Sequence, residues 1–182
     1  MIETARLVLR QWRDADREPF AAMRLDPEVM AHLPPLTREE SDAAVDRQMA
    51  LIAEHGHGFW AVERKADGAF LGFTGVKPTA PDLPFDGAPE VGWRLARHAW
   101  GAGYASEAAR ASLAYGFKVL GAPEIVSFTV PANTRSQAVM RRIGMTADPT
   151  RNFDHPVLPA GHRLRPHVLY ALRRPHVTAG ER

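Results

Sequence analysis

The segment from Glu90 to Leu120 constrains the fold more than any other part of the chain. Val91, Trp93 and Leu95 alternate on one face of a short run, which predicts a strand over residues 90–95. After a glycine-containing turn, apolar residues recur at helical spacing, with a glycine beyond the last of them: Ala105, Ala109, Leu113, Phe117 and Leu120, then Gly121. A strand, a glycine turn and an amphipathic helix in direct succession predict an α/β unit.

The flanking segments predict a mixed sheet with helices covering its faces. Asp67-Gly68 separates two aromatic-rich runs, Phe59–Val62 and Phe70–Phe73, which predicts a hairpin. Thr37 and Glu40 have the spacing of a capping box at the start of a helix. Further strands are expected at 7–9, 125–130 and 168–172, further helices at 15–25 and after Asn133, and loops at 78–89 and 148–166. Strands alternate with helices in the second half only, so the sheet is expected to be mixed.

Composition excludes several kinds of chemistry. The chain has 182 residues and no cysteine, which excludes disulfides, thiolate metal ligands and a cysteine nucleophile. The histidines fall in no recognised ligand spacing, so we expect no metal. A net charge of +2 gives no footprint for nucleic acid, and neither a signal peptide nor a membrane-spanning run is apparent. We expect a cytoplasmic protein with one domain over residues 1–175 and a short tail over 176–182.

The turn at residues 101–104 is the first candidate binding site. Gly101 and Gly103 allow a tight turn that a ligand can approach closely. The unpaired N–H groups and the dipole of the helix that follows suit a pyrophosphate. Ser106 stands where the dinucleotide-binding pattern needs a third glycine, and no Gly-Lys-Ser/Thr follows, so the turn is neither that pattern nor a P-loop. Two interpretations are open, an anion site or a turn that needs glycine for its geometry.

Asn133 is the second candidate, at the end of a predicted strand and the start of a helix. Its side chain can cap that helix, or its amide can reach a ligand amide lying between two strand ends. Ser136 follows one helical turn later and points the same way.

Together these segments resemble the GNAT superfamily of N-acetyltransferases. The family's acetyl-CoA loop has the pattern Gln/Arg-x-x-Gly-x-Gly/Ala, and residues 98–103 match it with His98 in the place of Gln or Arg. Such a loop binds pyrophosphate mainly through backbone N–H groups, so the change to His98 need not abolish binding.

The order of elements is most similar to the RimJ/RimL-type branch of that superfamily. The branch's run Trp-Gly-x-Gly-Tyr-Ala-x-Glu-Ala is matched by Trp100–Ala108. Its Asn-x-x-Ser helix start with a later Gly-Phe/Met pair is matched by Asn133–Met145, and its opening Thr-x-Arg-Leu-x-Leu-Arg by Thr4–Arg10. The resemblance covers nearly the whole chain, about residues 4–172.

This resemblance implies a fold and an activity. The fold is the GNAT fold, an α/β (α+β) structure with a mixed, mostly antiparallel sheet that splays between the strands at 90–95 and 125–130. The activity is direct transfer of acetyl from acetyl-CoA to an amine in a ternary complex. The amine belongs either to a small molecule or to a protein N-terminus, and the protein is either a monomer or a homodimer. The alternative function is a non-catalytic acyl-CoA-binding module.

The resemblance also implies which residues form the site. Those expected to contact the cofactor are Trp93, Arg94, Leu95, His98, Gly101, Ala102, Gly103, Tyr104, Ala105, Asn133 and Ser136. Ser136 matches the proposed proton donor to the leaving thiolate, with plain ligand contact or helix capping as the alternative. Glu90 matches a catalytic base, and a surface carboxylate is the alternative. His155 is a second candidate base with a suitable intrinsic pKa, but the sequence does not place it in the cleft and favours a solvated loop histidine.

Overall fold

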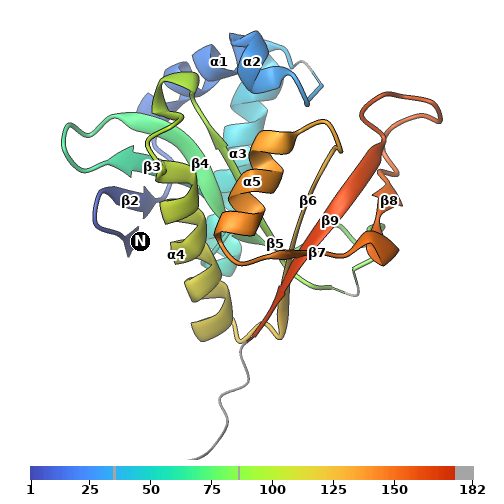
Figure 1. The fold of residues 1–182 in the computed structure, drawn as a ribbon. Coiled ribbons are helices and arrows are strands. Elements are labelled where there is room, and N and C mark those ends of the chain that lie inside the picture. Colours follow the sequence, from blue (N-terminus) through green and yellow to red (C-terminus); the bar gives the residue numbers. More distant parts are fainter. Residues whose placement is uncertain (35, 86, 175–182) are drawn as a thin grey trace, which may run out of the picture.

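The computed structural model describes residues 1–34, 36–85 and 87–174, and Figure 1 shows a twisted sheet with helices on both faces. The strands are β1 (Ile2–Glu3), β2 (Leu7–Arg10), β3 (Phe59–Arg64), β4 (Phe70–Lys77), β5 (Glu90–Leu95), β6 (Glu124–Thr129), β7 (Thr146–Ala147), β8 (Phe153–Asp154) and β9 (Pro166–Arg173). The helices are α1 (Arg17–Leu25), α2 (Pro27–Met30), α3 (Arg38–His55), α4 (Tyr104–Lys118) and α5 (Thr134–Arg142), with 3-10 turns η1 (Asp14–Asp16), η2 (Arg97–Ala99) and η3 (Pro149–Arg151). The predicted tail, 176–182, lies outside the described residues.

The sheet is mostly antiparallel and parts in its middle, as predicted. Its strands follow the order β1-β2-β3-β4-β5-β6-β9-β7, with β8 pairing β9. β5 and β6 are parallel and share one register pair, Glu90 with Val126. The Val126 N–H donates to the Pro89 carbonyl at 2.9 Å, and beyond this point the two strands separate. The sheet therefore consists of two antiparallel halves joined at one end of β5 and β6.

Helices cover the two faces of the sheet. In Figure 1, α4 and α5 lie in front of the sheet, and α3 lies behind it. Under α4 and α5 the buried core includes Val91, Leu113 and Ile125. A second cluster contains Phe20 from α1 and Val45 from α3, together with residues of β2, β3 and β4. Within the described residues, no helix is both long enough and apolar enough to cross a membrane.

Local sequence rules account for most element boundaries. The Thr37 hydroxyl accepts from the Glu40 N–H at 3.2 Å, and the Glu40 carboxylate accepts from the Thr37 N–H at 2.8 Å, so the capping box starts α3. Pro19 lies in the first turn of α1, where its missing N–H costs nothing. β3 and β4 form the predicted hairpin around Gly68, with one register shift after Val62.

The prediction of loops over residues 148–166 was wrong in part. This segment contains η3 and β8, and β8 pairs with β9 through Phe153 and His167. A two-residue strand carries no alternation that a sequence pattern can reveal, and it forms here because β9 offers it an edge. β1 and α2 escaped prediction for the same reason, since they span only two and four residues.

A buried ion pair fixes the chain where it leaves β2 for α1. Arg10 donates to both carboxylate oxygens of Asp16, at 2.7 and 2.9 Å, and to Glu63 at 2.7 Å. The side chains of Arg10 and Asp16 are only 6% and 4% exposed. Asp16 also accepts from the Arg13 N–H at 2.8 Å, which closes the η1 turn. This network orients α1 relative to the sheet.

Removing the charge of Asp16 should destabilise the protein strongly. Asp16→Asn leaves the buried guanidinium of Arg10 with one carboxylate in place of two, and we expect a loss of about 3 kcal/mol in the free energy of unfolding. The matched control is Asp14→Asn in the same turn, because Asp14 is 89% exposed and its ion pair among the described residues is with Arg17. It should cost less than about 1 kcal/mol. Urea unfolding measures both, and equal losses would contradict this account.

Candidate functional site

The turn before α4 has the backbone geometry of an anion site. Gly101 and Gly103 have φ angles of 79° and 80°, a conformation that favours glycine. A Cβ atom at Gly101 would meet nothing within 4 Å, so the backbone there is open to a ligand. The first hydrogen bond of α4 runs from the Glu107 N–H to the Gly103 carbonyl at 3.1 Å. The N–H groups of the first helical residues, Tyr104 and Ala105 among them, therefore have no partner within the helix.

The N-terminal segment holds this turn in place through Glu107. Its carboxylate accepts from the Thr4 hydroxyl at 2.6 Å and from the Arg6 N–H and Nε at 2.9 and 2.7 Å. Arg6 also donates to the Ala102 carbonyl at 3.0 Å and lies 4.5 Å over the Tyr104 ring. Burial favours a higher pKa for Glu107, but the hydrogen bonds from Thr4 and Arg6 outweigh it and lower that pKa. Glu107 is thus a structural anchor of the turn.

The gap between β5 and β6 exposes the backbone of Trp93. The Ala96 N–H donates to the Leu71 carbonyl at 2.8 Å, so in this register the backbone of Arg94 faces β4 and those of Trp93 and Leu95 face away from it. The Leu95 carbonyl accepts from the Trp100 indole at 2.8 Å. The N–H and C=O of Trp93 point into the gap.

Asn133 caps α5 and ties it to the end of β6. Its Oδ1 accepts from the Ser136 N–H at 3.2 Å, and its Nδ2 donates to the Thr129 hydroxyl at 2.9 Å. The capping interpretation of Asn133 thus describes its contacts in this structure. Ser136 is half-buried in the first turn of α5, and the cap uses its N–H and not its hydroxyl.

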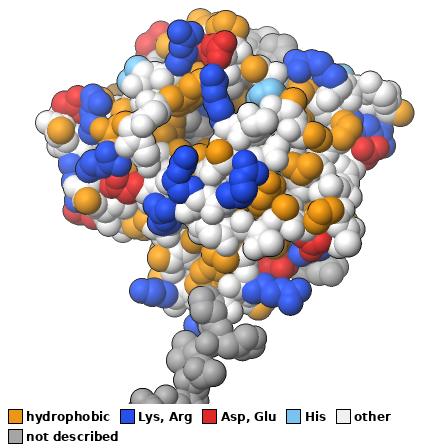
Figure 2. All heavy atoms as spheres, in the orientation of Figure 1, with side chains coloured by type: hydrophobic (Ala, Val, Ile, Leu, Met, Phe, Trp, Pro, Cys, Tyr) orange, Lys and Arg blue, Asp and Glu red, His pale blue; other side chains and the backbone are white. Residues whose placement is uncertain are grey.

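Basic side chains surround the turn. Arg135 lies 4.6 Å over the Trp100 ring, and Arg142 contacts the Ser106 hydroxyl at 3.4 Å. Figure 2 shows Lys and Arg side chains gathered over α5 and the first half of α4. Together with the helix N-terminus, they give this face a positive potential that suits a polyanionic ligand.

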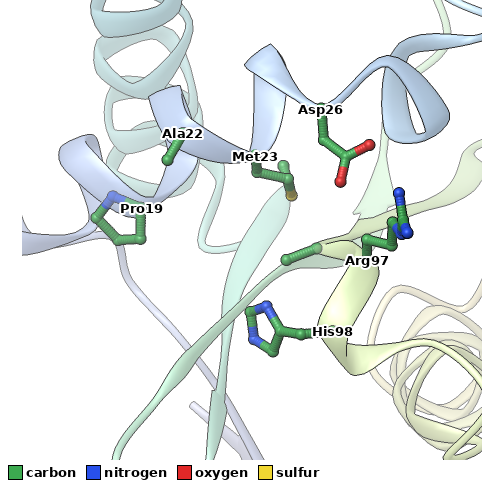
Figure 3. Close-up of a pocket in the computed structure, with 7 residues that line it drawn as sticks. Pro19, Ala22, Met23, Asp26, Arg97 and His98 are labelled. Atoms are coloured by element: carbon green, nitrogen blue, oxygen red, sulfur yellow. The ribbon is translucent and has the colours of Figure 1, made fainter.

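A groove of about 530 Å³ lies between α1 and η2, directly after β5. Its lining residues are Pro19, Ala22, Met23, Asp26, Ala96, Arg97 and His98. In Figure 3, Asp26 and the α1 residues form one side, and Arg97 and His98 form the other. The groove thus places His98, the first residue of the predicted acetyl-CoA loop, beside an opening that reaches the end of β5.

The face of β5 opposite α4 carries Glu90, Gly92 and Arg94. Their cross-strand partners on β4 are Lys77, Gly75 and Phe73, in that order. Glu90 pairs with Lys77 at 3.1 Å, and its side chain is 15% exposed. The ion pair fixes the Glu90 carboxylate at the end of β5 where the gap begins, so it is not a freely solvated surface group.

His155 lies in an aromatic cluster and not in a solvated loop. Its ring is 5.1 Å from that of His167 and 6.4 Å from that of Phe128, and Phe153 stacks on His167 at 5.4 Å. Burial lowers the pKa of His155 and of His167. Glu90 acts in the opposite direction on the pKa of His167, which places this cluster near the carboxylate.

Acid should destabilise the protein through these two histidines. Burial lowers their pKa in the folded state, so the unfolded chain, whose histidines titrate near 6.5, binds more protons as the pH falls below that value. The free energy of unfolding should therefore decrease from pH 7.5 to 5.5. His167→Phe keeps a ring against Phe153 and should reduce the decrease, whereas His55→Phe on the exposed side of α3 should not. Urea unfolding at the two pH values measures this, and an unchanged decrease in His167→Phe would contradict it.

Sequence patterns missed the partners that hold the site together. Lys77 lies opposite Glu90 only because of the β4–β5 register, and Trp100 reaches Leu95 only because η2 folds back. A period-2 pattern assigns faces to each strand but does not fix how two strands slide against each other. No sequence signal we used could have found either contact.

Comparison with known proteins identifies relatives along most of the chain. Residues 6–146 match the family model of the acetyltransferase (GNAT) domain. The chain is 32% identical over 157 residues to the uncharacterized protein YkkB of Bacillus subtilis, covering 85% of this chain and 90% of YkkB. It is also 32% identical over 152 residues to the FsC-acetyl coenzyme A-N(2)-transacetylase of Aspergillus fumigatus, covering 80% of this chain and 64% of that protein.

Solved structures share the fold. An acetyltransferase from Agrobacterium tumefaciens superposes with a TM-score of 0.77 at 28% identity, covering 95% of this chain and 94% of that one. RimL, a ribosomal L7/L12 α-N-protein acetyltransferase solved in complex with coenzyme A, superposes with a TM-score of 0.73 at 17% identity, covering 93% and 95%. The second likeness is one of fold alone.

Proposed function

Because the chain belongs to the GNAT acetyltransferase family, we propose that it transfers an acetyl group from acetyl-CoA directly to an amine in a ternary complex. The observation that carries this proposal is the free backbone edge of Trp93 beside the open turn of Gly101 and Gly103. One feature suits the extended pantetheine chain and the other suits the pyrophosphate. The RimJ/RimL-type assignment, with a small-molecule or protein N-terminal amine as acceptor, is part of this proposal.

Acetyl-CoA fits these features in a defined orientation. Its pyrophosphate accepts hydrogen bonds from the N–H groups at the start of α4, within the positive field of Arg135 and Arg142. Its pantetheine chain lies along Trp93 as a short extra strand. The thioester carbonyl then accepts an N–H from this edge, which stabilises the negative charge that develops on the carbonyl oxygen during attack.

The remaining steps transfer protons away from the amine and to the leaving thiolate. An amine is protonated near neutral pH and must lose a proton before it attacks the thioester carbon. We assign Glu90 as the base that accepts this proton, directly or through water, with His155 as the alternative base. The tetrahedral intermediate then expels the thiolate of CoA, which takes a proton from the Ser136 hydroxyl, and the second proton lost by the amine nitrogen restores that hydroxyl. The products are the acetylated amine and free CoA.

Binding of CoA tests the first part of the proposal. Gly103→Asp places a carboxylate and a Cβ at the turn, where both oppose a pyrophosphate, and it should weaken the affinity for CoA at least about tenfold. Gly121→Asp is the matched control, because Gly121 also has a positive φ of 68° but lies beyond the other end of α4. Calorimetry on folded variants measures the affinities. Unchanged affinity in Gly103→Asp would remove the turn from the site.

Turnover tests the two assigned roles. Ser136→Ala and Glu90→Gln should each lower kcat by about 10²- to 10⁴-fold, as expected when a general acid or base is lost. Affinity for acetyl-CoA should change by no more than about tenfold. Since the cap of α5 uses the Ser136 N–H, which alanine keeps, the melting temperature of Ser136→Ala should hold. Thr134→Ala, an exposed position in the same turn, is the control.

CoA release measured with a thiol reagent across a panel of amines gives kcat and KM. A loss confined to KM in Ser136→Ala would mean that the hydroxyl only contacts the cofactor. Retained turnover in Glu90→Gln would transfer the role of base to His155 or to water. Absence of CoA release with every amine, despite tight CoA binding, would favour the alternative of a non-catalytic acyl-CoA-binding module.

A further inference from the structure

Arg94 lies on the face of β5 opposite α4 and has no counter-charge among the described residues. Its backbone pairs with β4, and its guanidinium lies 5.3 Å over the ring of its cross-strand partner Phe73, on the face opposite α4. Its Nη1 is buried and has no hydrogen-bond partner among the described residues. Arg10, in contrast, is the more fully buried residue and has two carboxylates as partners, whereas Arg94 is half-buried and its buried Nη1 has none. Arg94 therefore lacks the partner that a buried guanidinium ordinarily has.

Arg24 on α1 repeats this arrangement from the other side. Its guanidinium lies 5.3 Å over the Phe20 ring, and its Nε is buried and unpartnered within the described part of the chain. The rings of Phe20 and Phe73 are 6.1 Å apart. The two arginines thus extend from one aromatic layer that joins α1 to β4.

The charges around the pair do not neutralise it. Burial lowers the pKa of Arg94 to about 9, and the positive charge of Arg24 acts in the same direction. Burial also lowers the pKa of Arg24, while Glu40 acts to raise it and Arg47 acts to lower it. Glu40 is engaged by the Thr37 N–H at the start of α3, and neither Arg24 nor Arg94 forms an ion pair within the described residues. Both guanidinium groups remain cationic at neutral pH.

Two close guanidinium groups on aromatic rings suit a carboxylate. Guanidinium presents paired donors that match the two oxygens of a carboxylate, and stacking on a ring holds its plane in place. An unpaired buried charge lowers the stability of the folded protein. An anion bound at these two arginines would offset that cost. The phosphates of CoA have their own positive site at the start of α4.

The position of Arg94 relates this anion site to the reacting centre. Arg94 directly follows Trp93, whose backbone faces the gap, and Glu90 lies four residues earlier on the same face as Arg94. At about 3.3 Å per residue, Glu90 and Arg94 are separated by about 13 Å along the strand. An amine that meets the thioester beside Trp93 would therefore hold its own anionic group near Arg94.

We propose that the acetyl acceptor is a compact amine that also carries a carboxylate, as an amino acid does, and that Arg94 and Arg24 bind this carboxylate. This inference rests on the proposed function, because it names the class of acceptor for the same site. The carboxylate orients the amine toward the thioester beside Trp93, and Glu90, about 13 Å from Arg94 along the strand, takes the proton through water. Arg94 and Arg24 therefore determine specificity and take no part in the proton transfers.

Matched acceptors test the proposal. We expect amino acids to be acetylated with a kcat/KM at least about tenfold higher than that of their uncharged carboxamides. Arg94→Gln and Arg24→Gln should each raise KM for the amino acid by about 10- to 100-fold and leave the carboxamide nearly unchanged. Arg47→Gln, which removes an exposed positive charge close to Arg24, is the control and should preserve the preference. Short peptides with an acidic second residue form a further arm, and an Arg94-dependent preference for them would place the carboxylate on a side chain.

Two further measurements make the outcome decisive. The cofactor contact expected of Arg94 involves its backbone, which glutamine keeps, while its side chain lies over Phe73 on the face opposite α4, so CoA affinity should be unchanged in Arg94→Gln. The melting temperature of this variant should be equal to or higher than that of the wild type, because an unpaired buried charge is removed. Equal use of amino acids and carboxamides by the wild type would overturn the proposal while leaving acetyl transfer intact. Calorimetric binding of the amino acid that requires Arg94, without CoA release, would support the carboxylate site and contradict the proposed transfer. Absence of Arg94-dependent binding to any carboxylate-bearing amine would also overturn the inference.

Discussion

The parting of β5 from β6 is the constraint on which the rest of the structure depends. Parallel strands ordinarily share an evenly spaced ladder of hydrogen bonds, but here they share one register pair at Glu90 and Val126. Beyond it, the peptide groups of Trp93 lose their protein partner while they stay inside the molecule. Unpaired peptide groups in the interior of a protein cost free energy. The gap therefore requires each half of the sheet to be stabilised by its own hydrogen bonds. The long antiparallel pairings of β4 with β5 and of β6 with β9 supply that security.

The flanking helices are arranged around this opening in complementary ways. α4 begins at the turn after β5, and α5 begins just after β6, so the N-terminal ends of both helices lie beside the strands that part. Arg6 and Glu107 hold α4 against the N-terminal segment, and Asn133 holds α5 against Thr129 at the end of β6. On the other face, the network of Arg10 and Asp16 sets the approach of α1. Each of these helices thus has its own polar anchor: α4 in the N-terminal segment, α5 at the end of β6 and α1 at the end of β2.

Sequence patterns predicted the elements well where a local rule fixes them. The capping box at Thr37 and the alternation over 90–95 each depend on residues a few positions apart, and both are found as expected. The turn before α4 could be predicted from its two glycines, because few other residues adopt the positive φ that such a turn needs.

The candidate site was predictable only as a set of separate residues. The sequence placed Glu90, Ser136 and the turn on their elements, but their partners depend on register and tertiary packing. Lys77 meets Glu90 through the β4–β5 register, and Arg24 approaches Arg94 through the docking of α1 on the sheet. The polar loop around His155 misled for a related reason, because its histidine packs on β9 and not into solvent. Contacts between distant segments leave no trace in a local pattern.

The outer edges of the sheet differ from the gap between β5 and β6 in how much unpaired backbone they present. β1 and β7, at the two ends of the strand order, are two residues long, and β8 on the flank of β9 is equally short. Such short edges offer little template on which a strand from another chain could grow. Among the described strands, β5 has backbone groups without a strand partner beside β6, in the middle of the sheet. The short outer strands thus limit pairing with other chains, while the free backbone of β5 remains for the strand-like pairing that we propose for the pantetheine chain.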